Sequence, residues 1–434
     1  MTGISLRFCG KLAELSDEER RPLFNRSAAV DEVTRRTTSA IITRVQSNGD
    51  DALRALAREF DGVALDSVEV APSDIKRALG SLDRGVRRAM DRAAKNIERV
   101  HRAWLPSESQ IEVEPGIVVG RRPDPLGRVG VYAPGGRAAY PSSVLMGAVP
   151  ARVAGVGEVI LCSPPGPNGI PSDAVLAAAA IAGVDRVFAV GGAGAIAAMA
   201  FGTESIPIAD KIVGPGNAFV AEAKAQLASV VAFDSPAGPS ELLVIADSSA
   251  DPSIIAREML AQAEHDPRAV VVAIAIGEDV AVNLSRALSE EAASVRRSEI
   301  VVESLAARGG IVWVSDVFDA ITAANTFAPE HLLIATNDSA SIVSRIRNAG
   351  TVFVGETSSV AFGDYITGAN HVLPTGGLAR SYSGLSTLDF FRWTTWQTVS
   401  PEAAAHLADD TATFARAEGL DAHATAAAAW SRST

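Results

Sequence analysis

The spacing of apolar residues predicts a helical beginning, a long middle region of alternating strands and helices, and a helical end. In residues 75–105, apolar positions recur at helical spacing among many arginines, and Pro72-Ser73-Asp74 is typical of a helix start. We therefore predict that the chain is mostly helical before the middle region. The stretch 121–127 holds two prolines and a glycine, which predicts a linker.

From residue 129, short aliphatic runs alternate with segments of helical length, in two successive sets. The predicted strands are 129–133, 158–162, 186–190, 211–213 and 230–233 in the first set, and 241–246, 269–276, 310–314, 332–335 and 351–354 in the second. Predicted helices between them include 173–183, 218–227, 252–264 and 317–327. Strands that alternate with helices predict mostly parallel sheets, so the sequence indicates two α/β domains. From about Tyr382 onward the pattern is helical again.

The composition is that of an acidic globular protein. The 434 residues are 47% hydrophobic with a net charge of −12, and they contain no basic stripe of the kind that nucleic-acid binders carry. The longest apolar stretches, 174–184 and 187–202, are each shorter than the roughly 20 residues of a membrane span. The N-terminus lacks a signal-peptide layout, and two cysteines are too few for a disulfide framework. We therefore expect a cytoplasmic protein that binds neither nucleic acid nor membrane.

One glycine-rich segment matches a dinucleotide-binding loop. Residues 192–197 fit the G-x-G-x-x-A pattern, follow a predicted strand and open a predicted helix. The acidic residue expected about 20 positions further on is missing, because Asp210 precedes its strand. A tight strand-to-helix turn explains the segment equally well. Further glycine turns that allow close approach of a ligand lie at 134–136, 214–217 and 238–241.

Four of the six histidines have neighbours that suggest a metal or catalytic site. His101 and His406 lie in polar helical surroundings, and we expect both at the surface. Gln262 and His265 are three residues apart, so on a helix they share one face, and an imidazole is a common zinc ligand. The alternative is a polar helix end, where a cationic histidine interacts favourably with the helix dipole.

The remaining candidates lie in loops or near the C-terminus. Glu330 and His331 stand between a predicted helix and a predicted strand, and both types of side chain perform acid–base work near neutral pH. Asp364 and His371 belong to a glycine-punctuated loop, where an oxygen ligand and a polar contact to substrate are possible roles. Residues 417–423 add a glutamate and a histidine. The alternatives are solvated turns for the loops and a frayed tail for the last segment.

In their order along the chain, these segments resemble the histidinol dehydrogenase family. The resemblance covers about residues 120–425, and its motifs are 129–132 with 134–136, 210–217, 237–241, 261–265, 328–331, 363–371 with 374–375, and 417–423. Several long motifs in the family's order are far more specific than any one of them alone.

The resemblance implies a role for each matching residue. The implied zinc ligands are Gln262, His265, Asp364 and His423. The implied acid–base residues are Glu330 and His331, and the substrate site contains these six residues together with Ser240, His371 and Glu418. The implied NAD contacts are Tyr132, Asn217 and the position of Gly194, where the family usually has a glutamine.

The resemblance also implies an architecture. It is an α/β fold of two incomplete Rossmann-like domains, with helical N- and C-terminal segments, in an intertwined homodimer. The expected parts are a helical segment 1–25; a first α/β domain, 26–128 with 239–381, carrying most zinc and catalytic residues; a second α/β domain, 129–238, on the NAD side; and a helical segment 382–434 that reaches the partner subunit. His423 and Glu418 are then expected to complete the partner's site.

The implied reaction is the four-electron oxidation of L-histidinol to L-histidine through bound L-histidinaldehyde, the last step of histidine biosynthesis. It uses two NAD molecules in turn and one zinc ion per subunit to hold the amino alcohol. Two alternatives stay open: a zinc- and NAD-dependent dehydrogenase of the same family that acts on another small polar alcohol, and a zinc hydrolase or zinc-binding protein without redox chemistry.

Overall fold

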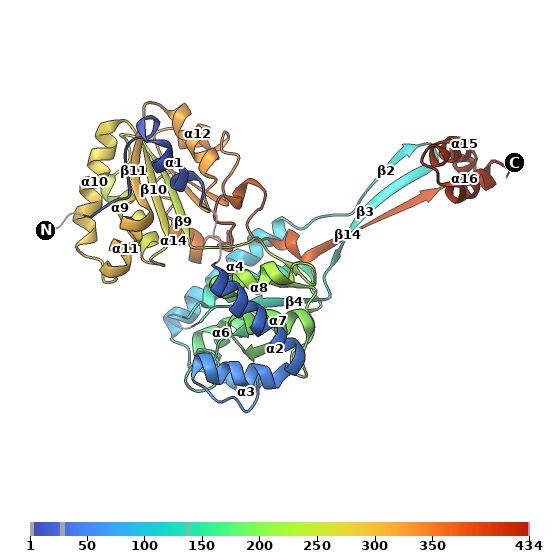
Figure 1. The fold of residues 1–434 in the computed structure, drawn as a ribbon, viewed down its shortest axis with the longest axis horizontal. Coiled ribbons are helices and arrows are strands. Elements are labelled where there is room, and N and C mark those ends of the chain that lie inside the picture. Colours follow the sequence, from blue (N-terminus) through green and yellow to red (C-terminus); the bar gives the residue numbers. More distant parts are fainter. Residues whose placement is uncertain (1–3, 27–30, 136–138, 433–434) are drawn as a thin grey trace.

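The structure of the protein, a computed structural model, describes residues 4–26, 31–135 and 139–432. It contains two parallel β-sheets, each covered by helices, and a long arm that carries the C-terminal helices away from them (Figure 1). The predicted α/β class with parallel sheets is therefore confirmed. None of the helices in the described ranges combines the length and apolar character needed to cross a membrane.

Six parallel strands form the larger sheet, in the order β1-β11-β10-β9-β12-β13. They are β1 (Phe8–Lys11), β9 (Glu241–Ala246), β10 (Val270–Ile276), β11 (Gly309–Val314), β12 (His331–Ala335) and β13 (Thr351–Val354). The last five agree with the predicted second set of strands. β1 lies in the segment that was predicted to be helical, and that prediction is wrong for residues 8–11. Four residues are too few to show a strand's alternation, and β1 forms by pairing with β11.

Helices cover both faces of this sheet because successive strand residues point to opposite sides. Leu242 and Val244 of β9 belong to one hydrophobic core, and Leu243 and Ile245 belong to another. The first core includes α9 (Pro252–Ala263), α10 (Glu278–Ala292), α11 (Ser298–Arg308) and α14 (Val360–Tyr365). The second includes η1 (Leu12–Glu14), α1 (Asp17–Phe24), α12 (Val317–Phe327) and α13 (Ser339–Val343).

The smaller sheet has five parallel strands in the order β6-β5-β4-β7-β8. They are β4 (Arg128–Tyr132), β5 (Glu158–Ser163), β6 (Arg186–Ala189), β7 (Lys211–Val213) and β8 (Ala232–Phe233). The connecting helices are α5 (Pro141–Ala154), α6 (Asp173–Ala182), α7 (Gly192–Phe201) and α8 (Ala218–Leu227). These elements agree with the predicted first set.

The early helices pack on the smaller sheet. They are α2 (Glu32–Leu56), the π-helical turn η2 (Ala57–Asp61), α3 (Pro72–Ser81) and α4 (Arg84–Ala103). Buried residues such as Val45, Leu53 and Ile97 share one hydrophobic core with the residues of β4 to β7. This packing differs from the expected grouping of 26–128 with 239–381. The reason is that the apolar faces of α2, α3 and α4 are buried against α5 to α8, which follow them in the chain.

The arm consists of three antiparallel strands in the order β14-β3-β2, followed by helices. Its elements are β2 (Ser109–Glu114), β3 (Ile117–Pro125), β14 (Phe391–Val399), α15 (Pro401–Ala417), α16 (Asp421–Ala428) and η5 (Ala429–Arg432), and two short turns, η3 (Leu378–Arg380) and η4 (Thr387–Phe390), precede β14. Two predictions are wrong here: 121–127 is largely strand rather than linker, and 391–399 is strand rather than helix. The prolines of β3, Pro123 and Pro125, lie beyond the end of β2, where β3 pairs only with β14 and needs fewer amide donors.

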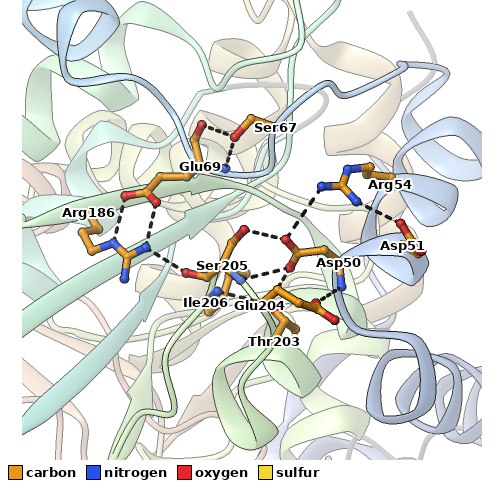
Figure 2. Close-up of polar contacts among 10 residues, drawn as sticks. All are labelled: Asp50, Asp51, Arg54, Ser67, Glu69, Arg186, Thr203, Glu204, Ser205 and Ile206. Carbon is orange, nitrogen blue, oxygen red and sulfur yellow. Dashed lines mark hydrogen bonds and ion pairs between the residues drawn. The ribbon is translucent and has the colours of Figure 1, made fainter.

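A polar network fixes α2 against the loop that follows α7 (Figure 2). Inside α2, Gly49 has φ 48° and ψ −129°, which kinks the helix. The next residue, Asp50, is buried, and its carboxylate accepts hydrogen bonds from the hydroxyls of Thr203 and Ser205. Its backbone amide donates to the Glu204 carboxylate at 2.8 Å. The network therefore sets the direction of the second half of α2, whose residues Leu53 and Leu56 line the cavity described next.

Candidate active site

A cavity of 1270 Å³ lies between the two parallel sheets. The larger sheet contributes the amino ends of β9 and β12, and the smaller sheet contributes the carboxyl ends of β4, β6 and β7. In the smaller sheet, the strand order runs from β4 to β6 on one side and from β7 to β8 on the other, so it reverses at β4. Rossmann-like sheets bind their ligands at such a reversal, at the carboxyl ends of the strands. Ten of the twelve site residues expected from the sequence line this one cavity: Tyr132, Gly194, Asn217, Ser240, Gln262, His265, Glu330, His331, Asp364 and His371.

The local backbone turns the Glu330-His331 pair into the cavity. Helix α12 ends at Phe327, and Ala328 follows with φ 53°, the one non-glycine residue with positive φ among those the structure describes. Such a conformation costs on the order of 1–3 kcal/mol and is typical of functional loops. The chain then enters β12 at His331, which pairs with Leu242 of β9.

His331 is buried between two carboxylates. Its Nδ1 lies 2.9 Å from the carbonyl oxygen of Glu241, which can only accept, so Nδ1 carries a proton. Its Nε2 has no hydrogen-bond partner among the described residues and lies 3.4 Å from Oδ1 of Asp364. Burial alone lowers the pKa of an imidazole, but the Glu330 and Asp364 carboxylates outweigh it and hold the pKa of His331 well above its usual value.

Glu330 is the buried carboxylate beside this histidine. Its Oε2 accepts a hydrogen bond from the backbone amide of Glu241 at 2.7 Å and lies 3.4 Å from Nδ1 of His331. Burial raises the pKa of Glu330, although His331 and the Glu241 amide act in the opposite direction. A carboxyl group whose pKa is raised toward neutrality is suited to giving and taking protons.

Asp364 and His371 belong to the loop that begins in α14. Nδ1 of His371 lies 2.8 Å from the backbone carbonyl of Asp364, so the loop holds this imidazole itself. Burial lowers the pKa of His371, and Asp364 only partly compensates. Burial alone raises the pKa of a carboxyl, but the neighbouring imidazoles, first of all His331, lower the pKa of Asp364. Asp364 is therefore a carboxylate beside the imidazole of His331, with His265 and His371 lining the same cavity.

Gln262 lies in the last turn of α9, which ends at Ala263, and His265 follows directly after the cap residue Glu264, so the predicted helix holds only the first of the two. Gln262 is 3% exposed, and no hydrogen bond of its side chain is found within the described residues. Burial lowers the pKa of His265, and the charge of Asp364, which lines the same cavity, acts in the opposite direction. Neutral imidazole is the form that binds metal ions.

Tyr132 and the glycine loop meet on the opposite wall. Gly192 has φ 60° and donates its amide hydrogen to the Tyr132 hydroxyl at 3.1 Å. Burial raises the pKa of Tyr132 to about 12, so the hydroxyl stays protonated. The strand–turn–helix context predicted for this loop is confirmed, since β6 precedes it and α7 follows.

Gly194 is packed against α2, which explains why a glycine stands there. A Cβ at this position would lie 3.1 Å from Cδ1 of Leu56, so a longer side chain requires that leucine to move. Asn217 caps α8 with its side-chain oxygen, which accepts from the amides of Phe219 and Val220. Of the predicted turn 134–136, residue 136 lies outside the described residues.

A buried ion pair that no sequence pattern indicated lies next to Glu330 and His331. Arg26 donates to the Glu241 carboxylate at 2.9 Å, and its guanidinium lies 3.4 Å from the centre of the Phe327 ring. Glu241 in turn contacts both Glu330 and His331 through its backbone. The sequence around Arg26 gives no sign of this ion pair, because the Glu241 and Phe327 partners of Arg26 follow about two hundred residues or more later.

Glu418 and His423 are not brought to this cavity by the chain that carries them. Both are exposed and lie at the end of the arm, Glu418 directly after α15 and His423 in α16 (Figure 1). Exposed apolar side chains surround them in the sequence, among them Phe414, Leu420 and Trp430.

His101 differs from its prediction as a surface residue. It is fully buried, its Nδ1 accepts a hydrogen bond from the amide of Thr387 at 3.2 Å, and its ring packs edge-on against Trp104. Residues of α5 and η4, far away in sequence, cover this face of α4. His406 is exposed, as predicted.

An imidazole between two carboxylates, in a cavity bounded by two Rossmann-like sheets, defines an acid–base enzyme site. The histidinol dehydrogenase family profile matches residues 24–430. Histidinol dehydrogenase from Methanothermobacter thermautotrophicus is 47% identical, with 88% of this chain and 90% of the relative covered. The enzyme from Methanosarcina mazei is 44% identical, with 95% of each chain covered. The crystal structure of histidinol dehydrogenase from Elizabethkingia anophelis matches with a TM-score of 0.94 and 33% identity, over 99% of both chains. The chain belongs to the histidinol dehydrogenase family.

Proposed function

We propose that this protein oxidises L-histidinol to L-histidine in two NAD-dependent steps, with L-histidinaldehyde held in the site between them. The reaction completes histidine biosynthesis. The observation that carries the proposal is the buried Glu330-His331-Asp364 cluster at the meeting point of two Rossmann-like sheets. The family membership supports the same substrate.

A zinc ion fits the donors of the proposed ligand set. Gln262, His265 and Asp364 line one cavity, and their amide oxygen, imidazole and carboxylate are donors that zinc accepts. In the described residues, no group of three His, Cys, Asp or Glu side chains has metal-binding geometry. The proposed set supplies only two such side chains from this chain, with the amide as third ligand and His423 of a second copy as fourth. Zinc, when bound, orients the amino alcohol by its nitrogen atoms.

His331 performs the proton transfers at the carbinol carbon. Its Nδ1 proton is held by the Glu241 carbonyl, so Nε2 is the atom that faces the reacting hydroxyl. In the chain alone, Asp364 helps to keep Nε2 protonated. A cation held by Asp364 would weaken that influence, and Nε2 would then be free to accept the proton of the alcohol while the hydride goes to the cofactor.

Glu330 serves the second half of the reaction. As water adds to the aldehyde, Glu330 would take a proton from the water, for which its raised pKa suits it. The protonated His331 would return its proton to the carbonyl oxygen, which forms the hydrated aldehyde and restores His331 as a base. His331 then accepts a proton from the hydrated aldehyde as the second hydride leaves. Ser240, His371 and the partner's Glu418 are proposed to hold the polar groups of the substrate.

The NAD side of the cavity is proposed to consist of Tyr132, Asn217 and the first turn of α7 at Gly194. The start of α7 has no side-chain cap, and apart from the Gly192 amide, which donates to the Tyr132 hydroxyl, its first backbone amides are available to a phosphate. The nicotinamide end must reach toward Ser240 and His331, which line the same cavity.

The proposed assembly is a homodimer in which each arm completes the other subunit's site. The arm leaves large apolar side chains exposed, including Ile111, Val113, Phe414 and Trp430, all between 54% and 71% accessible. Exposed apolar groups of this number mark an interaction surface. The dimer also explains why Glu418 and His423 lie at the tip of the arm.

The test is NADH formation by the zinc-loaded protein with L-histidinol. Two NADH per histidinol, with histidine as the product, support the proposal. If no NADH forms with histidinol but another small amino alcohol is oxidised, that alcohol replaces histidinol as the proposed substrate. If no NADH forms with any member of a panel of amino and hydroxy alcohols, the dehydrogenase proposal is wrong, and the alternative of a zinc protein without redox chemistry remains.

A further inference from the structure

The glycine loop of this protein lacks the acidic partner that dinucleotide-binding units normally supply. In such units, a carboxylate after the next strand accepts hydrogen bonds from the ribose of the adenosine half. The only acidic residue near that position, Asp210, lies at the wrong edge of the sheet. Its carboxylate accepts from the amide of Arg128, at the amino end of β4, whereas the cavity lies at the carboxyl ends.

A carboxylate from another element lies on the cofactor side of the cavity instead. Asp61 ends the π-helical turn η2, which follows α2, and it lines the cavity together with Phe60. Gly62 donates its amide hydrogen to the carbonyl of Ala57, the i to i+5 bond of a π-turn. Ala57 is buried, and an ion pair of 2.8 Å between Arg44 and Glu59 ties the turn to α2. The turn is therefore anchored, and Asp61 has a defined place.

The position of Asp61 follows from its neighbours. Asp61 lines the same cavity as Tyr132 and as residues 192–194, the first turn of α7. The Tyr132 hydroxyl accepts from the amide of Gly192 there, and burial, with a smaller contribution from the charge of Asp61, raises the pKa of Tyr132 to about 12. Asp61 and the proposed phosphate site therefore belong to one cavity. No ion pair or hydrogen bond of the Asp61 carboxylate is found among the described residues; the residue is exposed, and partial desolvation raises its pKa.

The cationic residues of the cavity lie on its other side. Arg268, Arg297 and Arg308 come from the unit of the larger sheet, and the charge of Arg297 acts on His265. Among the described lining residues up to Ser240, there is no lysine or arginine. As far as the described residues show, a 2′-phosphate at Asp61 would meet a carboxylate and no lysine or arginine on the Asp61 side of the cavity wall.

We propose that Asp61 accepts the hydroxyls of the adenosine ribose of NAD and excludes the 2′-phosphate of NADP. The inference rests on the proposed NAD-dependent function. A carboxylate accepts hydrogen bonds from two vicinal hydroxyls well, and like charges that face each other are unfavourable. The carboxylate that is missing after the strand following the glycine loop is then supplied by η2, the turn that follows α2.

Direct binding tests the proposal without turnover. Isothermal titration of the zinc-loaded full-length protein gives the Kd of NAD and of NADP for the unaltered protein and for Asp61→Asn and Asp61→Ser. The unaltered protein should prefer NAD by at least about a hundredfold, and both variants should reduce that preference by about tenfold or more. Asp66→Asn is the matched control, because Asp66 is exposed, close in sequence and outside the cavity lining. Circular dichroism and melting temperature check that each variant is folded.

The outcomes separate this inference from the proposed function. If NAD binds and both folded Asp61 variants keep the full preference for NAD, Asp61 is not the discriminating residue, and the proposed function survives. If Asp66→Asn changes the preference as much as the Asp61 variants do, a general charge effect replaces the inference. If the unaltered protein binds neither dinucleotide, both the proposed function and the inference are wrong.

Discussion

Nε2 of His331 and Oδ1 of Asp364 face each other at 3.4 Å, without a hydrogen bond that would satisfy the imidazole. A buried nitrogen without a partner is costly and is retained where a ligand or a reaction uses it. The same carboxylate is a proposed zinc ligand. Asp364 therefore connects the proposed metal site with the proposed acid–base residue His331, and the two proposed roles can be tested by separate substitutions.

Replacing the acid–base residue should affect turnover far more than binding. We expect His331→Asn to lower kcat by about a hundredfold to ten-thousandfold, with little change in KM, because the hydroxyl proton loses its acceptor. Glu330→Gln should impair mainly the aldehyde step, so histidinaldehyde oxidation should fall more than histidinol oxidation. Steady-state kinetics with both substrates measures this. His406→Asn, an exposed histidine, is the control, and a variant of His331 with normal kcat would contradict the assignment.

Zinc content should distinguish ligands from substrate contacts. We expect His265→Ala and Asp364→Asn to lower zinc affinity by at least about tenfold, because each removes a donor. His371→Ala should keep its zinc and raise KM, since this residue is proposed to contact the substrate. Metal analysis after dialysis against a weak chelator, together with kinetics, gives both quantities. Equal zinc loss in all three variants would show that the ligand set is wrong.

Acid should destabilise the protein through His101. Burial lowers the pKa of His101 to about 4, below the ordinary value of 6.5. Between these pKa values the unfolded chain binds more protons, so stability falls as the pH falls from about 6.5 toward 4. The cost amounts to about 2 kcal/mol between pH 7 and pH 5. Denaturant unfolding at both pH values should show a smaller loss in His101→Gln than in His406→Gln. Equal losses of unfolding free energy in the two variants would show that groups other than His101 cause the destabilisation by acid.

Local signals predicted the regular elements well. In α8, Asn217 is the cap residue and the apolar run ends at Leu227, so the predicted helix 218–227 and the observed one coincide. The strands around His331 and Glu241 were also found, because continuous aliphatic runs are typical of buried parallel strands. These elements already place Ser240 and the Glu330-His331 pair at strand starts.

Nonlocal packing could not be predicted in the same way. Trp393 of β14 pairs with Pro123 of β3, and this contact spans most of the chain, so neither segment shows its strand character alone. His101 is buried by Thr387 and its neighbours, again far away in sequence. The catalytic cluster itself was recognised by resemblance to a family, since spacing alone left solvated turns open as the alternative.

The kink in α2 should require glycine at position 49. Its φ of 48° and ψ of −129° cost a residue with a side chain roughly 1–3 kcal/mol. A methyl group there would also overlap the Glu204 carboxylate, which accepts from the amide of Asp50. We therefore expect Gly49→Ala to lower the melting temperature clearly. Gly80→Ala in α3 is the matched control, because a methyl group there meets no atom within 4 Å and should be neutral or slightly stabilising. Equal melting temperatures in the two variants would contradict the strain argument.

Mixing two inactive variants tests the shared site most directly. Glu330→Gln disables the cavity of its own subunit, whereas His423→Ala is proposed to disable the cavity of the partner. A hybrid dimer then has one site with both defects and one intact site. Random reassociation makes about half of the dimers hybrids, so about a quarter of the wild-type sites, and of the activity, should return.

The control for this experiment is a mixture of Glu330→Gln with His331→Asn. Both changes lie in the cavity of their own subunit, so every site of every dimer keeps one defect and activity should stay at background. Recovery in the first mixture and none in the second requires that the arm of one subunit completes the site of the other. Absence of recovery in both mixtures, with subunit exchange verified by mass, would leave His423 and Glu418 without a role in catalysis.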